Sequence, residues 1–327
     1  MRFGFTDEQL ALRDAVRDLL GDACPPAAVR AAWAVDDPLG YDPQLWRSLG
    51  TMGVLGVLAP EDAGGLGLTE VDLVLLLEET GRVAFPGPIV EHAAVAVPLL
   101  ASAGAALAAA AVAGDVVVTF ADRSSRVGWG ASAAAVLLVG DGAVRLVEGA
   151  PSSPLQSVDR SRRDVALTGT DGAVVEGDVA LALDRAVLGS SAQQCGLAAR
   201  MIDMTVDYTS TRRQFGVPVG SYQALKHHLA DALLLLEHAR PAVYRAAWSI
   251  AHRRPTVSRD VSMAKVMADR AAAGAARAAL QCHGAIGYTW EHDLHLWMKR
   301  VWVLERLWGG TATHRTRVAD AVCGPPT

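Results

Sequence analysis

The long helical periodicity of residues 181–327 is the feature that most constrains how this chain can fold. In three successive segments, apolar or small residues recur at alternating steps of three and four, beginning at Leu188, Tyr222 and Val257. Such spacing marks one buried face on each of three long helices. A further apolar segment begins at Leu294, and short links join the four segments. We therefore predict a C-terminal four-helix bundle in this region.

Residues 1–113 also carry the signals of helices. Thr6 can accept a hydrogen bond from the first helical turn and Gln9 can return one, as in a capping box. Asp42 followed by Pro43 is a second helix start, because proline is tolerated in a first turn, where its missing N–H is not needed. These signals predict an N-terminal helical domain.

Residues 114–180 contain short apolar or alternating runs that are typical of strands. Two of these runs, 135–139 and 143–147, are separated by Asp141-Gly142, a strong hairpin signal. We predict a small β domain of five or six strands. The predicted fold class is therefore mainly α with a small β domain, which lies between the N-terminal helical domain and the C-terminal bundle.

The composition excludes several classes of function. The charged residues are mixed in sign and the net charge is −5, which argues against a nucleic-acid partner. No apolar run is long enough to span a bilayer, and the N-terminus lacks the apolar stretch of a secretory signal, so we expect a cytoplasmic protein. The four cysteines show no CxxC spacing, and we predict no metal site.

Two short motifs carry most of the functional information. The first is the stretch 212–216, Arg-Arg-Gln-Phe-Gly, which Gln223 follows; the second is the stretch 281–288, Gln-Cys-His-Gly-Ala-Ile-Gly-Tyr. Each lies at the end of a predicted helix and offers cationic, amide or backbone N–H donors, as a diphosphate-bearing cofactor requires. An alternative reading of the two arginines is a solvated helix C-terminus, where cations favour the helix dipole.

The order of the three regions, together with these motifs, resembles the acyl-CoA dehydrogenase family. The stretch 212–216 is similar to the family's Arg-x-x-Phe-Gly segment, and the stretch 281–288 is similar to its Gln-x-x-Gly-Gly-x-Gly-Tyr segment. Gly310-Thr311 lies where the family has a Gly-Thr turn before the last helix. Within the family, the chain looks like the short subunit of heteromeric enzymes from sterol-degrading bacteria.

The resemblance implies that flavin adenine dinucleotide (FAD) binds across a subunit interface. Arg212 would reach the diphosphate of the neighbouring subunit's FAD. The residues implied at the adenine side are Gln214, Phe215 and Gln223. The second motif would present amide groups of Gln281, Gly284 and Ala285, and the start of the last helix would contact another part of the FAD through Thr311 and Thr313. The implied partners are an acyl-CoA substrate, further subunits in a homo-oligomer or a heterotetramer, and electron-transfer flavoprotein as electron acceptor.

The implied chemistry is α,β-dehydrogenation of a thioester, in which a carboxylate removes the α proton. Many family members have a glutamate directly before the Gly-Thr turn, but this chain has Gly309 there. Other members place it in a Leu-x-Leu-Glu-Arg context, where this chain has Asp184. Asp184 is our predicted base, with capping of the first bundle helix as the alternative. Glu305 is a weaker candidate for the base.

The β region departs from the family pattern. The stretch 118–125 stands where the family has Thr-Glu-Pro-Gly-x-Gly-Ser-Asp, and it lacks the proline and the glycines. The first hypothesis is a dehydrogenase that is active alone or with a partner subunit. Because the proline and the glycines are missing, two alternative functions remain open. One is a non-catalytic partner subunit of a heteromeric acyl-CoA dehydrogenase. The other is a non-redox enzyme that acts on a carrier-bound acyl group.

Overall fold

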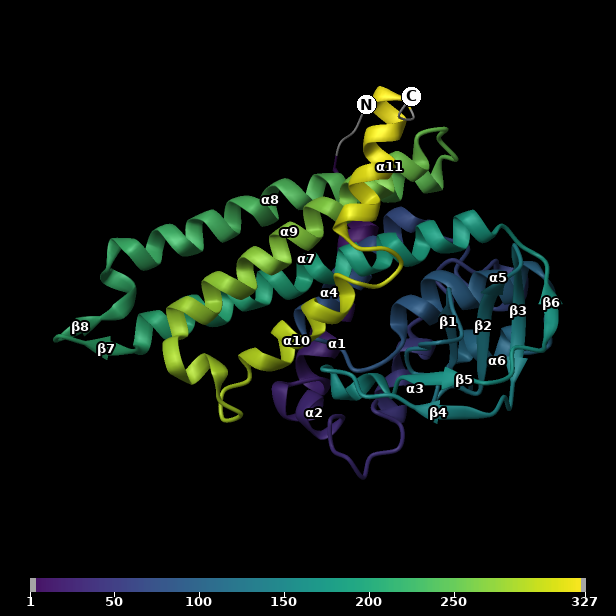
Figure 1. Ribbon diagram of the computed structural model, residues 1–327, viewed down its shortest axis with the longest axis horizontal. Helices are drawn as coiled ribbons and strands as arrows, with labels where there is room; N and C mark the ends of the chain where they lie inside the picture. Colours follow the sequence, from purple (N-terminus) through teal and green to yellow (C-terminus); the bar gives the residue numbers. More distant parts are fainter. Residues whose placement is uncertain (1–3, 325–327) are drawn as a thin grey trace.

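The computed structural model describes residues 4–324, and helices dominate its N-terminal part (Figure 1). As predicted, α1 begins with a capping box, in which Gln9 N donates to Thr6 Oγ1 and Thr6 N donates to Gln9 Oε1. The second predicted start is also present, since Asp42 caps the helix whose first residue is Pro43. The N-terminal elements are α1 (Asp7–Ala23), α2 (Pro26–Ala31), α3 (Pro43–Thr51), η1 (Glu61–Ala63), α4 (Glu70–Arg82), η2 (Val90–Ala96), α5 (Val97–Ser102) and α6 (Ala108–Ala113).

The β region forms a mixed four-stranded sheet in the order β1-β2-β3-β6 and a separate pair, β4-β5. The predicted hairpin joins β2 to β3, with φ of 51° at Asp141 and 76° at Gly142. Positive φ at both loop residues defines the type I′ turn that the Asp-Gly pair favours. The elements of this region are β1 (Val118–Ala121), β2 (Ala135–Gly140), β3 (Ala143–Glu148), β4 (Ser152–Pro154), η3 (Arg160–Arg162), β5 (Val165–Leu167) and β6 (Ala173–Val175).

The C-terminal region is built on long helices that run side by side, away from the sheet (Figure 1). Helix α9 packs on both α7 and α8 through a face made largely of alanine, which allows the helices to approach closely. The elements are α7 (Val179–Thr211), β7 (Arg213–Gln214), β8 (Val217–Pro218), η4 (Val219–Ser221), α8 (Gln223–Ala251), α9 (Val257–His283), η5 (Gly284–Tyr288), α10 (Leu294–Leu304) and α11 (Thr311–Cys323). The predicted fold class, mainly α with a small β region, is confirmed.

Helices α4 and α7 cross where each contributes a glycine. A Cβ on Gly196 would lie 1.9 Å from the carbonyl oxygen of Glu78, and a Cβ on Gly81 would lie 2.1 Å from that of Gln193. Only glycine permits this backbone approach.

A continuous hydrophobic core joins the N-terminal helices, the inner side of the sheet and the bundle.

Candidate cofactor-binding and catalytic site

The first motif forms a hairpin at the end of the bundle that lies farthest from the sheet (Figure 1). Arg212 ends α7, and the short strands β7 and β8 follow, with Phe215 and Gly216 as the two turn residues. Their φ angles are 49° and 82°, so this is a second primed turn. Phe215 is 92% exposed, so a large apolar side chain at the tip is left almost uncovered by the described part of the chain.

The polar side chains around this hairpin are free to bind a ligand. Within residues 4–324, the side chains of Arg212, Gln214 and Gln223 are exposed and make no hydrogen bond or ion pair. A groove of about 530 Å³ separates the end of α7 from the start of α8. Its walls are formed by Val206, Thr209, Ser210, Pro218, Gly220, Ser221, Leu225, Lys226 and Leu229.

The second motif lies at the same end of the bundle. Helix α9 stops at His283, because Gly284 adopts φ 65° and ψ −141°, outside the helical region. Nothing lies within 4 Å of the position that a Gly284 Cβ would occupy, and Ala285 is exposed as well. Gln281 is exposed and borders a groove of about 370 Å³ between α8 and α9.

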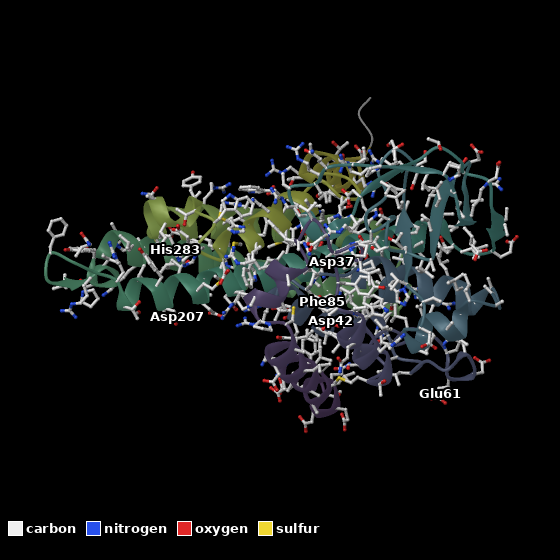
Figure 2. All side chains as sticks on the ribbon, turned by 90° about the horizontal axis from the view of Figure 1, so that it is seen from below. Asp37, Asp42, Glu61, Phe85, Asp207 and His283 are labelled. Atoms are coloured by element: carbon white, nitrogen blue, oxygen red, sulfur yellow. The ribbon has the colours of Figure 1, made fainter. Side chains whose placement is uncertain are left out.

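His283 fixes the second motif against α7. Its ring stacks on Tyr208, with ring centroids 4.4 Å apart, and its Nδ1 contacts the carbonyl oxygen of Ala279 at 2.8 Å. Figure 2 shows His283 and Asp207 together at this end of the molecule, away from Phe85 and Asp42. The ring is buried, so His283 has a structural role here.

This end of the bundle fits one half of a dinucleotide. The guanidinium of Arg212 and three side-chain amides have no partner among residues 4–324, and the backbone at Gly284 is open. These are the donors that a diphosphate and an adenine need. The structure thus brings together Arg212, Gln214, Phe215, Gln223 and, across the bundle end, the second motif.

Asp184 lies elsewhere, within the second turn of α7. The alternative that Asp184 caps this helix is wrong, because the helix begins five residues earlier and Asp178 caps it by accepting a hydrogen bond from Leu181 N at 3.0 Å. Within the described residues, the Asp184 carboxyl has no hydrogen-bond partner. Burial raises its pKa to about 6, against the opposing charge of Arg317. Asp184 is therefore a half-buried carboxyl with its acceptor oxygens unused.

The turn before α11 is held by a buried charge pair that the sequence reading missed. Lys265 Nζ donates to Asp269 Oδ1 at 2.7 Å and to the carbonyl oxygen of Leu304 at 2.6 Å. Thr311 Oγ1 donates to the other oxygen of Asp269 at 2.9 Å, and Gln194 of α7 donates to the first. The pair thus fixes both ends of the loop 305–310. Its only sequence signal is a Lys and an Asp four residues apart, beside an alanine stripe.

Thr311 is held by this pair, because its hydroxyl donates to Asp269. Thr313 is exposed at the start of α11. Gly309 has φ 98°, a conformation that a side chain strains, and its missing Cβ leaves room for His314 Nε2 at 3.1 Å. Glu305 follows α10 directly, and burial raises its pKa, with a further contribution from Asp269.

A cavity of about 730 Å³ lies between the β region and the end of α10. Its wall includes Asp122, Arg123 and Ser125 from the end of the stretch 118–125 and its continuation at Arg126, and it faces Trp302 and Trp308. Arg123 is bound to Asp122 at 3.0 Å and Arg126 to Asp164 at 2.7 Å. Arg123 and Arg126 are therefore already paired with carboxylates, unlike Arg212 at the far end of the bundle.

The two groups of predicted residues are far apart within one chain. Asp184 and Arg212 lie on the same continuous helix, and roughly 40 Å of helix separates them at about 1.5 Å per residue. Thr311 belongs with Asp184 and not with Arg212, because Asp269 links it to Gln194 in the N-terminal half of α7. No single FAD molecule can span this separation.

Two family models match this arrangement of helices, sheet and bundle. The acyl-CoA dehydrogenase N-terminal domain matches residues 6–112, and the acyl-CoA dehydrogenase C-terminal domain matches residues 178–323. The chain therefore belongs to the acyl-CoA dehydrogenase family, among the oxidoreductases of lipid metabolism. Membership of this family supports FAD as the cofactor, as the sequence predicted.

Two curated relatives match the chain over nearly its whole length. The chain is 33% identical over 307 residues to the acyl-CoA dehydrogenase IpdE2 of Mycobacterium tuberculosis, covering 90% of this chain and 91% of that protein. It is 34% identical over 302 residues to IpdE2 of Mycolicibacterium smegmatis, covering 90% and 92%. Both alignments span almost the whole length of the two proteins.

The solved structures agree on the fold. The ChsE4–ChsE5 complex of Mycobacterium tuberculosis contains a chain with a TM-score of 0.87 and 26% identity, and both chains are covered completely. A Tcur3481–Tcur3483 steroid ACAD variant gives a TM-score of 0.87 at 26% identity, covering 97% of this chain and 98% of that chain. Butyryl-CoA dehydrogenase of Megasphaera elsdenii, at 19% identity and a TM-score of 0.85, shares the fold.

The described residues contain neither a grouped set of metal ligands nor a membrane-spanning helix. Within residues 4–324, no three His, Cys, Asp or Glu side chains are grouped so that they could hold a metal ion. Among the helices of this described part, none combines the length and the apolar character needed to cross a bilayer.

Proposed function

We propose that this chain takes part in the flavin-dependent α,β-dehydrogenation of an acyl-CoA thioester, inside an oligomer whose FAD sites are each built from two chains. The separation of Asp184 from Arg212 along α7 carries this proposal. Because one FAD cannot contact both residues in the same chain, each chain offers its bundle end to a cofactor that a neighbour holds at the catalytic end.

At the bundle end, the proposed role is to hold the cofactor. Arg212 would pair with the diphosphate, since its guanidinium is exposed and has no partner among the described residues. Gln214, Gln223 and Gln281 would donate or accept hydrogen bonds at the adenosine, and Phe215 would cover it. Gly284 and Ala285 would leave the backbone open to close approach.

At the catalytic end, Asp184 would remove the α proton of the thioester. Its carboxylate oxygens have no partner within residues 4–324, and a pKa of about 6 makes it ionised yet basic near neutral pH. Bound FAD would accept the β hydrogen as hydride. The Lys265–Asp269 pair would hold the turn with Gly309 and Thr311 in place beside the substrate.

The proposed assembly is a homo-oligomer or a heterotetramer, with electron-transfer flavoprotein as the acceptor of the electrons. The likeness to a chain of the ChsE4–ChsE5 complex supports a heteromeric form.

The absorption spectrum of the purified chain tests the proposal. We expect flavin absorbance that bleaches anaerobically with an acyl-CoA substrate, and we expect Arg212→Gln to lower the flavin content. Asp184→Asn should keep the flavin and abolish bleaching. Bleaching at the normal rate in Asp184→Asn would show that another group is the base.

A second candidate function is that of a non-catalytic partner subunit. It is favoured by Gly309, which cannot act as a base, and by the pairing of Arg123 and Arg126 with carboxylates of their own chain. This candidate requires a chain without colour when it is purified alone and a yellow complex after co-expression with a second acyl-CoA dehydrogenase-like chain. Turnover in that complex that does not depend on Asp184 would favour it over the first proposal.

A further inference from the structure

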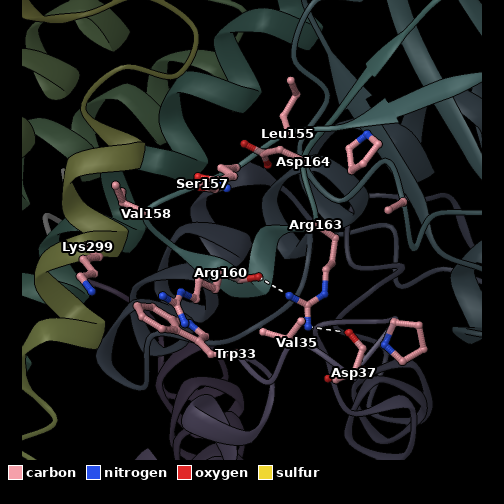
Figure 3. Close-up of a pocket in the computed structure, with 14 residues that line it drawn as sticks. Trp33, Val35, Asp37, Leu155, Ser157, Val158, Arg160, Arg163, Asp164 and Lys299 are labelled. Atoms are coloured by element: carbon pink, nitrogen blue, oxygen red, sulfur yellow. Dashed lines mark hydrogen bonds between the residues drawn. The ribbon is translucent and has the colours of Figure 1, made fainter. Parts of the chain in front are cut away.

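A second cavity of about 710 Å³ lies between the segment that follows α2, the segment 154–164 and α10 (Figure 3). Trp33, Arg160 and Lys299 gather at one end of it, from three separate elements. Its volume is in the range of small-molecule sites. Apolar side chains make up much of the remaining wall: Val35, Pro38, Ala131, Pro154, Leu155 and Val158.

The two cations at this end have no anionic partner. Lys299 Nζ lies 4.0 Å from the ring centroid of Trp290, and the guanidinium carbon of Arg160 lies 5.0 Å from the same centroid. Lys299 also lies 5.2 Å from the ring of Trp33. Within residues 4–324, neither side chain makes a hydrogen bond or an ion pair. Burial lowers the pKa of Lys299, and the nearby charge of Arg160 lowers it further.

The basic residue Arg163 also lacks a carboxylate partner. Within residues 4–324, its guanidinium donates only to main-chain carbonyl oxygens, including those of Ala34 at 2.7 Å and Asp37 at 2.5 Å. Arg163 therefore adds a third positive charge to the wall of this cavity.

The acidic residues of the wall do not neutralise these charges. Asp164 is paired on one oxygen with Arg126 and on the other with Arg162. The carboxylate of Asp37 accepts a hydrogen bond from Leu39 N and lies on the side of Arg163 away from Lys299 (Figure 3). The charge of Asp159 also acts on Lys299, but Asp159 is already paired with Arg300. The end of the cavity at Trp33 therefore carries the positive charges of Arg160 and Lys299, and neither is paired with a carboxylate of the described chain.

We propose that this cavity binds a phosphate-bearing ligand, with the phosphate between Arg160 and Lys299 and the body of the ligand against Trp33 and the apolar wall. A phosphate carries more charge than a carboxylate and has three acceptor oxygens, so it can pair with two cations from separate elements. A nucleobase or another apolar group of the ligand would then pack against the ring of Trp33 and the aliphatic side chains of the wall. The site lies apart from Arg212 and Asp184 and does not depend on the proposed dehydrogenation.

Calorimetric titration of the purified chain with ADP and with inorganic phosphate tests the proposal. The Arg212→Gln background removes the cation that we assign to the FAD diphosphate, so ADP binding at that end does not interfere. We expect Arg160→Gln and Lys299→Met each to weaken ADP binding about tenfold or more, because each removes one charged contact. Lys299→Arg keeps the charge and should retain most of the affinity.

Arg254→Gln is the matched control, because Arg254 is an exposed cation over another tryptophan, Trp248, at 5.8 Å. It should leave ADP affinity unchanged. ADP that binds more tightly than inorganic phosphate identifies a phosphate ester as the ligand, and equal affinities identify free phosphate. The proposal is overturned by ADP affinity that survives both charge-removing variants, or by the absence of binding to either probe, in chains that circular dichroism shows to be folded.

Discussion

At the scale of single residues, Asp184 combines partial burial with carboxyl oxygens that have no hydrogen-bond partner in the described part of the chain. Because its pKa is about 6, the carboxylate form is lost below that pH. We expect kcat/KM for acyl-CoA oxidation to rise with pH through about 6, and Asp184→Asn to lower it by roughly 10²- to 10⁴-fold, the range for loss of a general base. Steady-state rates between pH 5 and pH 8 measure both effects.

The pH dependence of protein stability gives an independent measure of the raised pKa of Asp184. Its pKa is raised from 3.8, so the fold disfavours the ionised form. This cost is absent below about pH 4 and complete above about pH 6, where it amounts to at most about 2 kcal/mol once solvent screening is allowed for. Asp184→Asn should therefore raise the melting temperature at pH 8 and not at pH 4. Asp178→Asn keeps a capping side chain but removes a charge that helps to raise the pKa of Asp184, so it should move the rise of kcat/KM to slightly lower pH; a rise that moves to higher pH would contradict the assignment.

His92 is expected to make the fold sensitive to acid. It is fully buried, its Nδ1 accepts from Val118 N at 3.1 Å, and its Nε2 contacts the carbonyl oxygen of Ala111 at 3.0 Å. Burial lowers its pKa from 6.5 to about 4. The unfolded chain therefore takes up the proton first, and stability that is complete above pH 6.5 falls as the pH drops towards 4.

Denaturant unfolding between pH 4 and pH 7 measures this loss, which we expect to reach about 3 kcal/mol for a shift of this size. His92→Gln removes the titrating ring, and its unfolding free energy should depend less on pH over the same range. An equal pH dependence in His92→Gln and the unchanged chain would assign the acid sensitivity to other groups.

At the scale of elements, the Lys265–Asp269 pair ties α9 to the end of α10 and the start of α11. Both side chains are buried, so removing either one leaves an uncompensated charge. We expect Lys265→Met and Asp269→Leu each to lower the free energy of unfolding by roughly 3–5 kcal/mol, while the double variant recovers much of that loss. Urea unfolding of the four chains gives the coupling, and strictly additive losses would argue against a direct pair.

Local signals in the sequence were enough to predict many elements. The capping box of α1, the Asp-Gly turn between β2 and β3 and the three-four periodicity of α7, α8 and α9 each depend on residues close together in the chain. Their physical causes are local, so they can be read without the tertiary structure.

Other features depend on distant parts of the chain. Asp178 and Asp184 are both residues of a type that can cap a helix, and the structure shows that Asp178 caps α7. Trp33 and Lys299 meet although they are far apart in sequence. The partners of the Lys265–Asp269 pair come from α7, α10 and α11. No local pattern contains this information.

At the scale of the whole molecule, the hairpin tip provides a test of assembly. Phe215 is 92% exposed, so Phe215→Asp removes no contact within the chain and should leave the melting temperature of the isolated chain unchanged. On the proposed assembly it should reduce both the oligomer and its flavin content. Light scattering after size-exclusion chromatography and the flavin absorbance measure these two quantities.

Val35→Asp is the matched control, because Val35 is equally exposed, at 92%, and lies by the N-terminal helices instead of the bundle end. It should leave the oligomer intact. If Phe215→Asp assembles and binds flavin as well as Val35→Asp does, the hairpin tip does not contribute to the interface.

The primed turn at Phe215 and Gly216 has a consequence for how the cofactor is retained. Because the hairpin is already folded in the isolated chain, closing a shared site needs two chains to meet, with no loop to be ordered first. On the proposed assembly, dilution separates the two halves of each site and releases the flavin together with the neighbour. The amount of flavin in a preparation then reports how concentrated the protein has been kept, as much as how tightly any one chain binds it.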